Sequence, residues 1–202
     1  MRSPEPAPLA PAQRELLLDL ARASIRSGLA RAVPQAVELD ALPPELAAPR
    51  ASFVTLTLQG RLRGCMGRLR AVRPLAEDVA GNAFAAAFLD PRFPPVAAGE
   101  VPDLAIEVSL LTPPEPIRFR SEADLIRRLV PGRDGLILAR GCRQATFLPD
   151  MWDQLPAPEA FVEQLLRKAG LARGEPGLEA WRYRTERIQA AQRQPAILAP
   201  SQ

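Results

Sequence analysis

Proline sets the first limit on how this chain can fold, because 23 of its 202 residues are prolines. Proline fixes its own φ, lacks a backbone N–H and breaks the interior of helices. The prolines gather near both ends of the chain and in the segments between apolar stretches. Short helices and strands joined by stiff loops therefore fit the sequence better than a bundle of long helices.

The stretch from Ser52 to Arg73 predicts a β-hairpin. In residues 53–58 (FVTLTL), every second residue is a valine or a leucine, and this alternation is typical of a half-buried strand. Gly60 can adopt the positive φ that a tight turn needs. In the strand that follows, we expect Leu62 to point inward and Arg63 to lie on the opposite face.

Helices and strands alternate along the rest of the chain. Expected helices cover residues 13–29, 74–89, 121–130 and 158–169, and expected strands cover residues 104–111, 136–138, 145–148 and 180–188. From residue 52 onward, the order of hairpin, helix and strand occurs twice, with one short helix between the copies. The sequence therefore predicts an α+β fold, either as one domain or as two small, intimately packed lobes.

Missing residue types exclude several kinds of chemistry. The chain has no histidine, which removes Ser-His-Asp and Cys-His catalysis and histidine zinc sites. Cys65 and Cys142 are the two cysteines, too few for a disulfide framework or an all-cysteine zinc site, so we expect no metal and no cofactor. No apolar run reaches membrane length and the start does not read as a signal peptide, so we expect a cytoplasmic protein with no membrane attachment.

The calculated pI of about 9.5 overstates how basic the protein is, because the net charge is only +3. Such a charge is ordinary for solubility, and we prefer this interpretation to a nucleic-acid footprint. Lys168 is the only lysine, so nearly every cation is a guanidinium group, which suits carboxylate and phosphate ligands.

Cys65 is the best candidate for a functional site. It lies between Gly64 and Gly67, and the cations Arg63 and Arg68 are close in sequence. We expect the thiol between a strand end and a helix start, where backbone N–H groups can face a ligand and nearby cations can lower the pKa of the thiol. The alternative is a small, buried cysteine that only packs, and the spacing alone favours this alternative.

Four other residues complete the candidate site. Arg63, Arg68 and Arg92 could form a pocket for a phosphate or carboxylate group. A solvated face paired with surface acids is the commoner fate of an arginine run such as that of Arg63 and Arg68, and loop capping or a sheet-face polar contact is the alternative for Arg92. Glu107 shares one face of its strand with Ser109 and could act as a general base, although a structural pair with an arginine is the alternative.

Several blocks of the sequence together resemble one protein family, the AMMECR-one domain family, and more narrowly AmmeMemoRadiSam system protein A. The blocks are LRGCMG (62–67), PLAEDVAGNAFAAAFLDPRFPP (74–95), IEVSLL (106–111), DGLIL (134–138) and ATFLPDMW (145–152). The family pattern around the cysteine is usually LRGCIG, so Met66 is a mild apolar departure. The resemblance predicts one domain over residues 11–188, and the residues at 1–10 and 189–202 themselves predict flexible tails. It also implies two related halves about a pseudo-dyad that form a barrel-like, antiparallel-rich sheet with helices outside.

The resemblance implies a Memo-type protein and a radical-SAM protein as partners, and assigns no reaction. We therefore keep three hypotheses, and leave open whether the protein is an enzyme. The first is a subunit of a modifying system whose Cys65 and Arg63 bind an anionic small molecule or the reactive group of a substrate. The second is a non-catalytic adaptor or regulatory protein that docks the two partners. The third, a nucleic-acid-binding module, is disfavoured because no stacking aromatics lie among the arginines.

Overall fold

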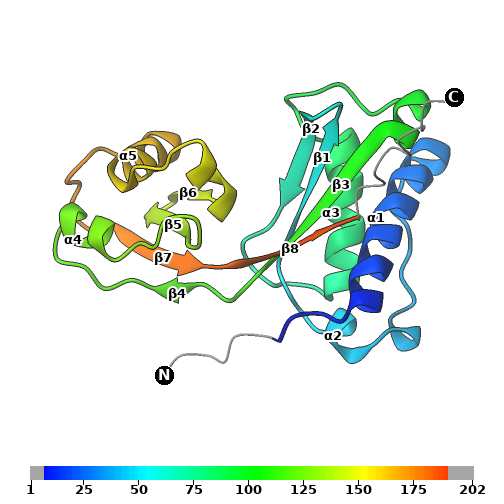
Figure 1. Ribbon diagram of the computed structural model, residues 1–202, viewed down its shortest axis with the longest axis horizontal. Coiled ribbons are helices and arrows are strands. Elements are labelled where there is room, and N and C mark those ends of the chain that lie inside the picture. The colour runs from blue at the N-terminus through cyan, green and yellow to red at the C-terminus, as the bar shows by residue number, and fades with distance from the viewer. Residues whose placement is uncertain (1–6, 191–202) are drawn as a thin grey trace, which may run out of the picture.

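Two lobes, each a four-stranded antiparallel sheet with helices, make up the computed structural model, which describes residues 7–190 (Figure 1). In the first lobe the strand order is β2-β1-β3-β8, and in the second it is β4-β7-β5-β6. The α+β prediction is therefore confirmed. Within the described residues both sheets are open, so the barrel-like sheet is not seen, and the pseudo-dyad stays a prediction.

The first lobe packs helices against one face of its sheet. Val54 and Leu56 of β1 and Val108 of β3 are fully buried beneath α1 and α3. The alternate residues of these strands face the other way, toward the second lobe. The elements are α1 (Pro11–Arg31), α2 (Pro44–Ala47), β1 (Ser52–Leu58), β2 (Arg61–Gly67), α3 (Leu75–Phe88), β3 (Leu104–Leu111) and β8 (Thr185–Gln189).

The second lobe has its own core, centred on Trp152 and Phe161. Their rings are stacked with centroids 3.7 Å apart, and the Trp152 Nε1–H donates to the backbone oxygen of Asp134 at 2.7 Å. The elements are β4 (Glu115–Pro116), α4 (Glu122–Arg127), β5 (Gly135–Arg140), β6 (Arg143–Phe147), α5 (Pro158–Ala169) and β7 (Glu179–Tyr183), with a short 3₁₀ turn at Pro149–Asp153.

The chain crosses between the lobes twice, and each crossing gives one lobe its edge strand. The units β1-β2-α3-β3 and β5-β6-α5-β7 have the same order, and each is completed by a strand that continues from the other lobe, β8 and β4 respectively. The two crossings are bonded together: the Thr112 N–H donates to the Arg184 oxygen, and the Arg184 N–H donates to the Thr112 hydroxyl, both at 2.9 Å. The doubled order expected from the sequence is thus present in the topology.

Two local predictions are wrong. The strand expected over residues 180–188 is two strands in different sheets, β7 and β8, interrupted at Arg184. Leu62 is 44% exposed rather than inward, because the pairing of β1 with β2 shifts between Leu56 and Thr57. Such a bulge adds one residue to β2 and reverses the faces beyond it. The predicted turn is confirmed, since Gly60 has a φ of 75°.

Parts of the segments expected as tails belong to the fold. Leu9 is buried and its N–H donates to the Glu186 carboxylate at 3.0 Å, and Gln189 is the last residue of β8. The remainder of the two expected tails, residues 1–6 and 191–202, lies outside the described residues.

Candidate functional site

A row of polar side chains crosses the face of the first sheet that the helices leave uncovered. The strand register places Cys65 opposite Thr55, Thr55 opposite Glu107, and Glu107 opposite Gln189. Directly opposed residues share a face, so a thiol, a hydroxyl, a carboxylate and an amide lie side by side. We call these four residues the thiol row.

Hydrogen bonds connect neighbours within the thiol row. The Thr55 hydroxyl lies 3.4 Å from the Cys65 Sγ, and the Gln189 amide donates to the Glu107 carboxylate. Ser109 also donates to Glu107, at 3.3 Å, as expected for two residues on one strand face. Because Thr55 stands between them, Cys65 and Glu107 are separated by two strand spacings, about 10 Å. The sequence prediction that both residues belong to one site is compatible with this arrangement, but they do not contact each other directly.

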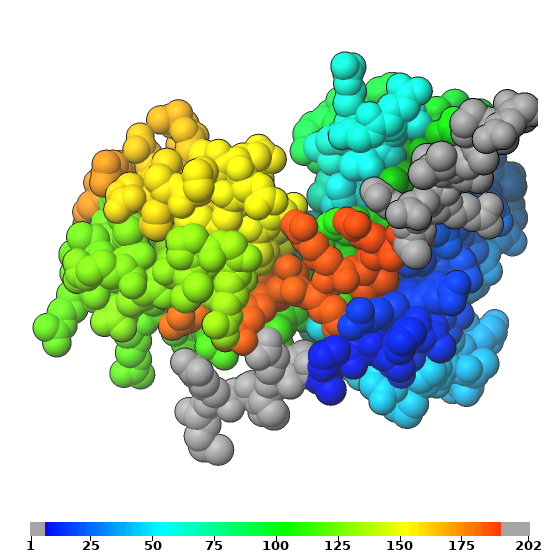
Figure 2. All heavy atoms as spheres, in the orientation of Figure 1, coloured from blue at the N-terminus to red at the C-terminus, as the bar shows by residue number. Residues whose placement is uncertain are grey.

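The second lobe faces the thiol row. Arg187 of β8 lies 3.8 Å from the Glu107 carboxylate and 3.5 Å from Asp150 in the 3₁₀ turn of the second lobe. Burial raises the pKa of Asp150, which the charge of Arg187 partly offsets and the charge of Glu107 reinforces. Figure 2 shows a notch in the surface between the second lobe and the β1–β2 hairpin. The row is thus a wall of the boundary between the lobes.

Lys168 of α5 supplies a cation from the second lobe. Its ammonium group donates to the Thr146 backbone oxygen at 3.1 Å and lies 5.1 Å from the centre of the Phe147 ring. Burial lowers the pKa of Lys168, the charge of Arg92 lowers it further, and Cys65 acts in the opposite direction. These couplings place Lys168, Arg92 and Cys65 within electrostatic reach across the boundary.

Asp90 and Arg92 fix the backbone of Cys65 on both sides. The Cys65 N–H donates to Asp90 Oδ2 at 2.9 Å, and Arg92 Nη2 donates to the Cys65 oxygen at 3.4 Å. Arg92 also donates to both Asp90 oxygens, at 2.9 and 2.7 Å. The hydrogen bond from Arg92, with that from Cys65, holds the pKa of Asp90 well below its usual range. Arg92 therefore contacts the backbone of Cys65, and its charge is already paired with Asp90; a ligand-binding role for Arg92 stays a prediction.

The Cys65 thiol is half-buried and is not activated in this state. Burial raises its pKa, and the hydrogen bond from Thr55 and the charge of Arg92 offset only part of that effect. Cys65 lies inside β2 rather than at a helix start, since α3 begins at Leu75, and its N–H is occupied. The expected exposed thiol on a helix-capping turn is therefore not what the structure contains.

The two arginines nearest to Cys65 in sequence have structural partners. Arg63 forms a two-point ion pair with Glu100, at 2.7 and 3.0 Å, and donates to the backbone oxygens of Pro94 and Pro95. This pairing, chiefly the hydrogen bond to Glu100, raises the pKa of Arg63. Arg68 lies 3.9 Å from the buried Asp78. The cations whose charges are coupled to the Cys65 thiol are Arg92, which is itself paired with Asp90, and Lys168.

The glycines beside Cys65 allow close packing rather than access for a ligand. A Cβ on Gly64 would lie 2.1 Å from the Ala86 backbone oxygen of α3. A Cβ on Gly67 would lie 2.3 Å from the Phe53 ring and 2.5 Å from the Ser52 oxygen. Only glycine fits at such distances. Gly64 and Gly67 thus set the position of the thiol without forming a ligand cradle.

Sequence reasoning missed the contribution of the second lobe. Lys168 stands out in the sequence only as the single lysine, and Asp150 lies within the ATFLPDMW block with no feature that marks it. No local pattern links these residues to Cys65, because α5 and the 3₁₀ turn reach the boundary only through the fold. In the part of the chain that the structure describes, no cluster of cysteine, aspartate and glutamate is placed to hold a metal ion, and no helix could span a membrane.

Comparison with known proteins assigns this architecture to a family. The AMMECR1 family model matches residues 18–188, so the chain belongs to the AMMECR1 family. A protein from Methanothermobacter thermautotrophicus is 39% identical over 170 residues, covering 82% of this chain and 86% of that protein. A Thermotoga maritima protein is 38% identical over 151 residues, covering 73% and 83%.

The fold also matches a solved structure. The crystal structure of uncharacterized protein PH0010 from Pyrococcus horikoshii superposes with a TM-score of 0.81 at 33% identity, covering 89% of this chain and 92% of that one. The family and the fold are thereby shown, and the names of these relatives state no activity.

Proposed function

We propose that the protein is a cytoplasmic subunit of a modifying system and that the thiol row is its working surface. The carrying observation is that Cys65, Thr55 and Glu107 lie side by side on the sheet face that looks toward the second lobe. A substrate group held there would meet a thiol at one end and a carboxylate about 10 Å away. Arg92 and Lys168 would supply positive charge for an anionic portion of the substrate.

The thiol in this role must be activated on binding. An un-ionised thiol is a poor nucleophile, and burial keeps Cys65 protonated in the isolated protein. An anion-binding cation displaced toward the thiol, or a partner protein that brings a cation to the boundary, would lower the pKa of Cys65. Glu107 could then accept a proton from a substrate group that spans the row. The partners we propose are a Memo-type protein and a radical-SAM protein.

The experiment compares three variants in a strain that lacks the native gene. Cys65→Ser and Glu107→Gln should each abolish the modified product that reappears with the unaltered chain, as measured by mass spectrometry of cell extracts. Cys142→Ser is the matched control, because Cys142 is exposed in the β5–β6 turn of the second lobe. Full function of Cys65→Ser would remove the thiol from the proposal.

The raised pKa of Cys65 also favours a second candidate, a non-catalytic adaptor. In this case the lobes dock the two partner proteins and the thiol only packs against Thr55. Co-purification separates the two candidates. An adaptor predicts that Cys65→Ser keeps both partner binding and function, whereas the modifying-subunit proposal predicts that binding persists and function is lost. Nucleic-acid binding through the arginines is not favoured, because Arg63 and Arg68 face structural partners.

A further inference from the structure

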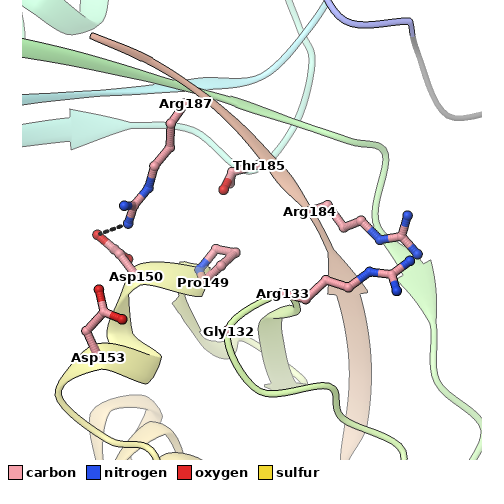
Figure 3. A pocket seen from close by; sticks show the side chains of 8 residues that line it. All are labelled: Gly132, Arg133, Pro149, Asp150, Asp153, Arg184, Thr185 and Arg187. Atoms are coloured by element: carbon pink, nitrogen blue, oxygen red, sulfur yellow. Dashed lines mark ion pairs between the residues drawn. The ribbon is translucent and has the colours of Figure 1, made fainter.

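A second cavity lies at the lobe boundary, separate from the thiol row. Its volume is about 420 Å³, within the range of small-molecule sites. The start of β8 forms one wall with Arg184, Thr185 and Arg187, and the second lobe forms the other with Arg133 and the 3₁₀ turn (Figure 3). Arg187 and Asp150 line this cavity and also lie beside Glu107 of the thiol row.

The cavity has charges of opposite sign at its two ends. Figure 3 shows Arg133 and Arg184 extending to one end, whereas Asp150 and Asp153 lie at the other, with Arg187 paired to Asp150 at 3.5 Å. The Arg133 guanidinium makes no hydrogen bond or ion pair with any residue that the structure describes. The arginine end thus presents a fork of donors to the cavity, and the aspartate end presents acceptors.

The charge balance favours a ligand that is itself a zwitterion. Guanidinium groups bind carboxylates in a two-point geometry, and carboxylates bind ammonium groups. Arg187 already balances Asp150, which leaves Asp153 as the acid for a cationic group and Arg133 as the guanidinium for an anionic one. We propose that this cavity binds a zwitterionic small molecule of the amino acid or short-peptide class, its carboxylate at the arginine end and its amino group at Asp153.

Glycine peptides test the proposal because they vary only in the separation of the two charges. Isothermal titration of the full chain with glycine, diglycine, triglycine and tetraglycine should reveal one length that binds best. For that length, the N-acetylated form, which lacks the ammonium group, and the C-terminal amide, which lacks the carboxylate, should each bind about tenfold more weakly. Inorganic phosphate, which carries only the anionic charge, should bind more weakly than the best peptide.

Variants assign each charge to its end of the cavity. Arg133→Ala should weaken binding of the free peptide about tenfold and leave binding of the C-terminal amide unchanged. Asp153→Asn should likewise weaken binding of the free peptide about tenfold, and should leave binding of the N-acetylated form unchanged. Both residues are exposed, so the variants should fold. Arg70→Ala, at an exposed arginine outside the cavity, and Cys65→Ser are controls that should bind as the unaltered chain does.

Three results would overturn the zwitterion site: no binding by any peptide of the series, equal binding of the capped and free peptides, or phosphate binding as tightly as the best peptide. Because Cys65→Ser should bind normally, failure of this cavity and failure of the thiol-row proposal are separate outcomes.

Discussion

The carboxylate of Asp90 accepts a hydrogen bond from the backbone nitrogen of Cys65 at 2.9 Å, and the same carboxylate is held by Arg92. A loop residue 25 positions away thereby fixes the strand that carries the thiol. The sequence does not hint at this contact, because a buried acid that binds a backbone N–H has no local signature. The position of the thiol therefore depends on the loop as much as on the hairpin.

Replacing Asp90 with asparagine should make the free energy of unfolding depend less on pH in the acidic range. The pKa of Asp90 is held below its usual range, so the ionised form stabilises the fold above the ordinary pKa of about 3.9, and this contribution is lost as pH falls below that value. Asp90→Asn should cost about 1–2 kcal/mol at pH 7 and less at pH 3, measured by urea unfolding. Asp103→Asn, at an exposed aspartate, should change neither value.

A methyl group at Gly64 should separate β2 from α3. The Cβ would lie 2.1 Å from the Ala86 oxygen, a backbone atom that cannot move without shifting the helix. We expect Gly64→Ala to reduce the free energy of unfolding by about 3 kcal/mol, measured by urea titration. Gly99→Ala is the matched control, because nothing lies within 4 Å of its added Cβ. Equal losses for the two variants would contradict the close approach.

The Cys65 thiol should titrate above the ordinary value. In a Cys142→Ser background, the alkylation rate with iodoacetamide should rise with a midpoint above about 8.5, because burial raises the pKa of Cys65. Thr55→Val should move the midpoint higher still, since the hydroxyl of Thr55 lowers it. A midpoint below 8.5, or no response to Thr55→Val, would mean that groups other than those described here determine the pKa of the Cys65 thiol.

The buried network beneath β1 should be sensitive to loss of its acceptor. Asp78 Oδ2 accepts from the Ser52 N–H, the Ser52 hydroxyl and the Asn82 amide, at 3.0, 2.7 and 2.8 Å. Asp78→Ala leaves the buried N–H and hydroxyl of Ser52 without their acceptor and should cost about 3 kcal/mol in thermal or urea unfolding, although the Asn82 amide still donates to Ser52. Asp19→Ala, at an exposed aspartate of α1, should cost less than about 0.5 kcal/mol.

Local patterns predicted the elements that local chemistry determines. The helix α5 matches the predicted range of 158–169, because Pro158 occupies its first turn and Gly170 ends it with a φ of 67°. The strand β3 matches residues 104–111 in the same way, since its alternation is regular. For α5, a proline at the start, a glycine at the end and the helical spacing of apolar residues between them are sufficient to predict the helix.

Long-range contacts determined what the sequence left open. Arg63 becomes the extra residue of the bulge because it pairs with Glu100, 37 positions away, while Gly64 packs on α3. The alternation through residues 180–188 gives no sign that the chain changes sheets at Arg184. That Glu107 and Cys65 belong to one site stays a prediction; their separation by Thr55 follows from strand register, which neither segment encodes alone.

The paired crossings at Thr112 and Arg184 limit how the boundary can move. A buried cluster adds to these bonds, because Ala51 and Leu111 of the first lobe pack with Ile137 and Tyr183 of the second. Since each lobe takes an edge strand that continues from the other lobe, a chain cut at either crossing would leave a sheet short of a strand. Both the thiol row and the charged cavity include residues of β8, so any displacement of this strand would alter both sites together.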